Sequence, residues 1–99
     1  MHHVKRIEIV IDKPHVSDVK RLLDRLGVPG ITILDTLAGY GDRGTRSGGD
    51  VSDAQVNSYI ITTCAPDKLD DLTASIEPLL RRFGGLCLIS DASVIRKDA

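Results

Sequence analysis

The chain has 99 residues, of which 41% are hydrophobic and 27% charged, proportions typical of one soluble globular domain. Its formal net charge of -1 argues against a nucleic-acid partner or an anionic membrane surface, because such partners select a basic surface. Two cysteines are too few for the disulfide framework of a small secreted domain, and no apolar run reaches transmembrane length. With no signal-peptide pattern either, we expect a cytoplasmic protein.

The first half of the sequence predicts a strand, a helix and a second strand. Residues 4–11 alternate between polar and apolar side chains, which is typical of a strand. Pro14 is tolerated in the first turn of a helix. Apolar residues then recur at helical spacing over 16–26, and Gly27 ends this helix. The stretch 31–37 predicts a second strand.

The second half repeats this order. The β-branched stretch 56–64 predicts a third strand, and an apolar stripe over 66–83 predicts a second helix. Pro78 should kink this helix or divide it into two pieces. The glycines at 84–85 end the helix, and a fourth strand is expected within 86–96.

This order predicts an α+β fold of the ferredoxin-like βαββαβ type, a four-stranded antiparallel sheet with two helices on one face. We place the two strands joined by the loop that follows residue 37 at the centre of the sheet. Val10 and the apolar fourth strand leave an apolar surface on the face without helices. Such a surface predicts a closed oligomer with ligand sites in clefts between subunits.

The loop at 39–50 is the strongest candidate for a working site. It contains five glycines, which allow backbone N–H groups to converge on an anion. Arg43 and Arg46 add forked, permanently charged donors that suit phosphate. On the residues alone, a solvated hairpin loop whose arginines contact nothing is an equal alternative.

The sequence resembles the PII signalling proteins over nearly its whole length. The similarity lies in Arg6-Ile7-Glu8, in Gly27-Val28-Pro29-Gly30-Ile31-Thr32, in Gly39-Tyr40-Gly41 and in the closing segment 91–96. The loop segment 43–49, together with Asn57, is similar to the PII-like branch associated with bicarbonate transporters and carboxysomes.

The resemblance implies a cytoplasmic homotrimer that binds adenine nucleotides in clefts between subunits. The chain would be a single PII-like domain over 1–99, with a ligand-responsive T-loop at about 41–56 that controls contact with a partner protein. The branch implies a membrane transporter or a carboxysome-related protein as partner, regulation of inorganic-carbon uptake, and bicarbonate as a second ligand. Classical members grip phosphate with a glycine- and lysine-rich segment, where this chain has only 83–85. That difference favours ADP or AMP, with ATP and cyclic AMP as the other candidates.

Carried over by position, the expected nucleotide-binding residues come from four places in the sequence. They are Gly39, Gly41, Arg43 and Arg46 in the loop, Gly30 and Thr32 at the neighbouring subunit's edge, Gly84 and Gly85 after the second helix, and Arg96. Each residue outside the loop also has an ordinary structural explanation. Gly30 can serve a turn, Thr32 a surface strand, and Gly84 and Gly85 a helix cap, while Arg96 can be a solvated side chain.

The sequence offers no catalytic arrangement, no metal site and no cofactor motif, so we predict a protein that is not an enzyme. His2 and His3 are expected to fray and His15 to lie on the surface. Cys64 and Cys87 are expected to be buried, reduced thiols. The alternative function is a small ferredoxin-like, phosphate-handling enzyme of the acylphosphatase kind, which turnover of an acyl phosphate would reveal.

Overall fold

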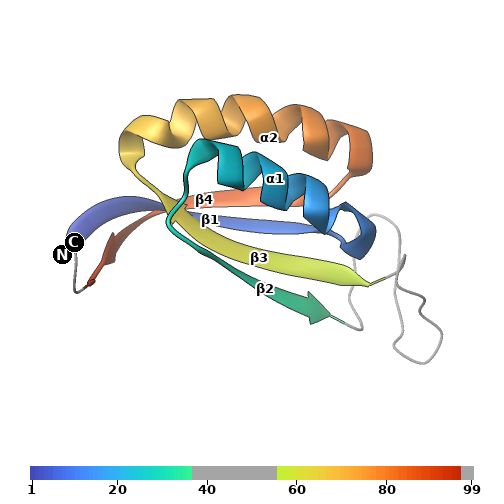
Figure 1. The fold of residues 1–99 in the computed structure, drawn as a ribbon, viewed down its shortest axis with the longest axis horizontal. Coiled ribbons are helices and arrows are strands. Elements are labelled where there is room, and N and C mark those ends of the chain that lie inside the picture. The colour runs from blue at the N-terminus through green and yellow to red at the C-terminus, as the bar shows by residue number, and fades with distance from the viewer. Residues whose placement is uncertain (37–55, 97–99) are drawn as a thin grey trace.

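Two layers, a sheet and a pair of helices, make up the part of the chain that the computed structural model describes, residues 1–36 and 56–96 (Figure 1). The elements are β1 (His2–Asp12), η1 (Lys13–His15), α1 (Val16–Leu26), β2 (Ile31–Thr36), β3 (Asn57–Cys64), η3 (Pro66–Lys68), α2 (Leu69–Phe83) and β4 (Leu86–Val94). The strands form one antiparallel sheet in the order β2-β3-β1-β4, and both helices cover the same face. The predicted ferredoxin-like fold is therefore confirmed.

The core lies between the sheet and the helices. Alternation along β1 turns Ile7, Ile9 and Ile11 toward the helices, where each is at most 1% exposed. The helices meet them with apolar stripes that include Leu23 and Leu72, both fully buried. These contacts between the sheet and the helices hold the two layers together. The residues at the two ends of the sheet are therefore available for a binding site.

The opposite face of the sheet, which we call the outer sheet face, carries a group of exposed apolar side chains, as the sequence predicts. Leu34, Leu86 and Leu88 are 55%, 46% and 56% exposed, and register places the first two level with Val10. Single exposed apolar residues are ordinary, but a group of them on one face is typical of an interface.

Four polar residues, Arg6, Glu8, Tyr59 and Ser90, lie among these apolar side chains. The Arg6 Nε atom is 3.5 Å from a Glu8 carboxylate oxygen and donates to the Ser90 hydroxyl at 3.1 Å. A hydrogen bond with Glu8 raises the pKa of Tyr59, with burial adding to the shift. Polar groups that already have hydrogen-bond partners within one chain lose less free energy when a second chain buries them.

Two expectations about placement in the sheet are wrong. β2 is an edge strand, because β3 pairs with β1 on its other side, so only one of the strands that enter the loop is central. His2 and His3 belong to β1 and pair with Val94 and Ser93 of β4. Backbone hydrogen bonding to β4 holds this terminus in place of the expected fraying.

Two expectations about the helical layer also need correction. α2 runs through Pro78 as one helix, so the predicted division into two pieces is wrong, whereas the alternative, a kink, stays a prediction. The missing N–H removes the hydrogen bond to the carbonyl of Ala74, which lies on an exposed part of the helix where water can replace it. His15 is half-buried and stacks on Phe83, with ring centroids 3.8 Å apart and 15° between the planes.

Candidate functional site

The ends of β2 and β3 that enter the loop are tied together by a short polar network. Ser58, fully buried, donates its hydroxyl hydrogen to Asp35 at 2.6 Å. The Lys13 ammonium lies 3.4 Å from the other Asp35 oxygen, and the Lys13 backbone N–H donates to the Val56 carbonyl at 2.7 Å. The Ser58 hydrogen bond first, and the Lys13 charge second, lower the pKa of Asp35. The base of the loop is thus fixed to η1 and to both strands.

Gly84 and Gly85 lie at this same end of the sheet. Gly84 has φ 82° and donates its N–H to the Leu80 carbonyl at 2.7 Å, which caps α2. Gly85 has φ 98°, and a Cβ there would lie 2.4 Å from the Val10 carbonyl oxygen. Both glycines therefore have a structural role, and at Gly85 only the absence of a side chain lets the backbone lie this close to β1.

The other predicted residues lie toward the opposite end of the sheet. The Gly30 carbonyl accepts a hydrogen bond from the Thr62 hydroxyl, and a Cβ on Gly30 would have nothing within 4 Å. Thr32 is exposed on the outer sheet face of the edge strand β2. Arg96 follows β4 and is exposed.

A cavity of about 410 Å³ lies beside Arg96, and its volume is in the range of small-ligand sites. Lys68 and His3 line it as further polar groups, while Val28 and Leu72 contribute apolar surface. Sequence reasoning missed Lys68 and His3, because one lysine at a helix start and one terminal histidine carry no signal. The cavity joins the turn after α1, the end of β3 and the segment after β4.

Predicted site residues thus form two groups, which β4 separates. Gly85 immediately precedes Leu86 and Arg96 follows Val94, and nine extended residues span about 27 Å at 3.4 Å per residue. One chain can therefore bring only one of the two groups to a given phosphate. A site that uses both groups needs a second copy of the chain.

The loop residues Gly39, Gly41, Arg43 and Arg46 lie outside the described residues, so their predicted role remains a prediction. Val56, the last residue of the predicted T-loop, is 5% exposed and directly precedes β3. Over 1–36 and 56–96, no three His, Cys, Asp or Glu side chains lie close enough together to hold a metal ion. Neither described helix has the length and apolar character needed to cross a membrane.

Both cysteines are free. Cys64 is buried as predicted, whereas Cys87 is only half-buried. Burial raises the pKa of both thiols, which keeps them protonated and weakly nucleophilic. The Lys5 charge acts on Cys64 in the opposite direction, but burial outweighs it and the thiol pKa stays raised.

Comparison with known proteins identifies the family. The model of the nitrogen regulatory protein P-II family matches residues 4–99, so the chain belongs to this family. No curated protein sequence matches.

Solved structures agree with this assignment. CPII from Thiomonas intermedia K12, a PII-like protein bound to ADP, AMP and bicarbonate, is 27% identical with a TM-score of 0.86, covering 96% of this chain and 91% of that one. Its form bound to ADP and bicarbonate is 29% identical, with a TM-score of 0.83 and the same coverage. A PII-like signalling protein from Thermus thermophilus, at 22% identity, shares the fold with a TM-score of 0.78, covering 97% of this chain and 93% of that one. Membership favours a regulatory protein over the acylphosphatase-like alternative.

Proposed function

We propose that this protein is a cytoplasmic signalling protein, not an enzyme, that senses adenine nucleotides in clefts between the subunits of a homotrimer. The observation that carries the proposal is the separation of the predicted site residues. Gly84, Gly85 and the loop base lie at one end of the sheet, and Gly30 and Arg96 lie toward the other. Two half-sites at opposite ends of one chain become complete when copies associate in a closed ring that brings one end of each copy to the other end of its neighbour.

The outer sheet face supplies the surface for that association. It carries Leu34, Leu86 and Leu88 with much of their area exposed, and burying them against other copies would stabilise a trimer. The hydrogen bonds among Arg6, Glu8 and their neighbours mean that little unpaired polar surface is buried with them.

ADP and AMP are the favoured ligands, and bicarbonate is the proposed second ligand. The support is twofold: CPII is bound to these molecules, and only 83–85 stands in place of the longer phosphate-gripping segment. Arg43 and Arg46 of the loop and Arg96 of the neighbouring copy would neutralise the phosphates.

Ligand binding would set the state of the T-loop, residues about 41–56, and thereby its contact with a membrane transporter or a carboxysome-related protein. A ligand shifts such an equilibrium only by its difference in affinity for the two loop states. Because Lys13, Asp35 and Ser58 fix the loop base, a change at the phosphates would be confined to the loop. This contact is how the protein would regulate inorganic-carbon uptake.

Calorimetry tests the ligand directly. ADP or AMP should bind at about one per subunit, and Arg46→Ala or Arg96→Ala should each weaken binding by roughly 1.5–3 kcal/mol, the range for hydrogen bonds to charged groups. Arg81→Ala is the matched control, since Arg81 pairs with Glu77 on the exposed side of α2. A folded trimer that binds no adenine nucleotide would contradict the proposal. Adding bicarbonate to the same titration tests whether the second ligand changes the nucleotide affinity.

A further inference from the structure

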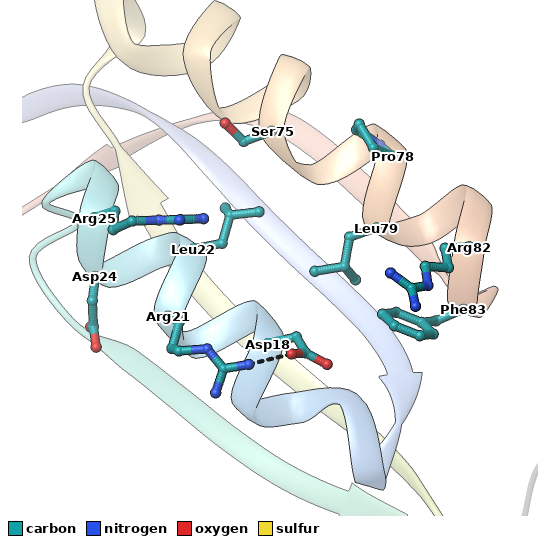
Figure 2. A pocket seen from close by; sticks show the side chains of 10 residues that line it. All are labelled: Asp18, Arg21, Leu22, Asp24, Arg25, Ser75, Pro78, Leu79, Arg82 and Phe83. Carbon is teal, nitrogen blue, oxygen red and sulfur yellow. Dashed lines mark hydrogen bonds and ion pairs between the residues drawn. The ribbon is translucent and has the colours of Figure 1, made fainter.

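A groove runs between α1 and α2 on the helical side of the protein, away from the outer sheet face (Figure 2). Its volume is about 590 Å³. The helices are antiparallel, so the start of α1 at Asp18 lies near the end of α2 at Arg82, and Arg25 lies toward Ser75 (Figure 2). The groove therefore has a defined direction and two distinct ends.

The groove exists because the row of α2 residues that faces α1 includes small side chains. Ser75 and Pro78 stand one turn apart where larger side chains would fill the space between the helices. Leu22, 4% exposed, and the half-buried Leu79 then form an apolar floor. Phe83 lies at one end, held by its stacking on His15.

Positive charge borders this apolar floor. Arg25 extends from one rim and Arg82 from the other (Figure 2), and Arg25 makes no ion pair within the described parts of the chain. Arg21 is neutralised by its hydrogen bond with Asp18. The Asp24 carboxylate points away from α2 (Figure 2). Asp18 and Asp24 also line the groove, but Asp18 is paired with Arg21 and Asp24 is turned away from α2. An incoming molecule therefore meets an apolar strip with the Arg25 and Arg82 guanidinium groups on its two rims.

The spacing of the two arginines selects the occupant. Arg25 lies toward Ser75, and seven residues of α2 separate Ser75 from Arg82, about 10 Å at 1.5 Å per residue. A third helix carries carboxylates at the same spacing when they stand at i and i+7, with apolar side chains at i+3 and i+4 on the same face. We propose that the groove between α1 and α2 docks an acidic amphipathic helix of a partner protein. Arginine rims around a small apolar centre are typical of such interfaces.

The experiment uses the intact, isotope-labelled protein and a synthetic helical peptide with glutamates at i and i+7 and leucines at i+3 and i+4. NMR titration should shift the signals of α1 and α2 residues along the groove. Arg25→Glu combined with Arg82→Glu should weaken binding at least about tenfold, because both carboxylates lose their partners. A twin peptide with lysines in place of the glutamates should bind this double variant and not the wild type.

Two controls separate the groove from general charge and from folding. Lys20→Glu with Arg81→Glu makes the same change in net charge on the same two helices, outside the groove, and should bind the glutamate peptide like the wild type. Ser75→Trp should block the peptide by filling the groove with no change of charge. NMR spectra of each variant show directly whether it is folded.

Several results would overturn the proposal. One is a wild type that ignores the glutamate peptide, and another is equal binding by the Arg25→Glu, Arg82→Glu variant. Inorganic phosphate or ADP producing the same shifts would make the groove an anion site and not a docking surface. Shifts that depend on protein concentration without peptide would make a second copy of this chain the occupant.

Discussion

Gly85 offers the sharpest structural test, because two separate costs of a side chain can be assigned to it. Its φ of 98° disfavours any L-residue, which costs about 1–2 kcal/mol. The Cβ of alanine would also lie 2.4 Å from the Val10 carbonyl oxygen, a backbone atom that can move only with β1. Overlap of this kind costs about 1–3 kcal/mol. Gly85→Ala should therefore destabilise the protein by about 2–5 kcal/mol.

Substitutions at two other glycines allow the backbone cost and the overlap cost to be measured separately. Gly27→Ala meets a φ of 71° but has nothing within 4 Å, so it should cost only about 1–2 kcal/mol. Gly30→Ala meets neither problem and should stay within about 0.5 kcal/mol of the wild type or stabilise slightly. Thermal unfolding at one fixed protein concentration measures all three, and Gly85→Ala should lower Tm by about 10–20 °C. A Gly85→Ala loss no larger than that of Gly27→Ala would refute the reasoning from close approach.

Three further predictions concern different parts of the chain. The Ser58 hydrogen bond lowers the pKa of Asp35, so the stabilisation it gives is fully present above the ordinary carboxyl pKa and is lost as pH falls through the lowered value, below about pH 4. Urea unfolding measured against pH should show this loss of stability, and Asp35→Asn should reduce it. Identical pH profiles for the wild type and Asp35→Asn would contradict this prediction. Cys64 should react with a thiol reagent far more slowly in the native protein than in denaturant, because burial raises the pKa of its thiol and blocks access to it. Equal reaction rates in the two states would show that the thiol is accessible in the native protein. Leu88→Glu on the outer sheet face should dissociate the proposed trimer, which light scattering measures, whereas Lys20→Glu on the exposed side of α1 should not. An unchanged mass for Leu88→Glu would argue against this face as the interface.

Most of the fold could be predicted because its signals are local. Alternation in β1 and the apolar stripes of α1 and α2 each depend on neighbours in the sequence. The place of β2 at the edge depends on pairing between strands far apart in the sequence, which periodicity does not report. The continuity of α2 through Pro78 depends on packing that outweighs one lost hydrogen bond.

The candidate site was less predictable, and for a physical reason. Gly84 and Gly85 were identified by position, but the close approach to Val10 that makes glycine necessary involves a strand near the other end of the chain. Lys68 lies beside Arg96 only because the turn after β3 and the segment after β4 meet at one end of the sheet. No local pattern encodes such a meeting.

A subunit-mixing experiment tests the central claim, a nucleotide site built from two chains, most directly. Arg46→Glu damages the loop half of the site and Arg96→Glu the other half, so neither homotrimer should bind ADP in calorimetry. After the two variants are unfolded together and refolded, about a quarter of the clefts should combine two intact halves and bind ADP with the wild-type affinity. If wild-type protein regains binding after this treatment but the mixture does not, the site does not lie between subunits.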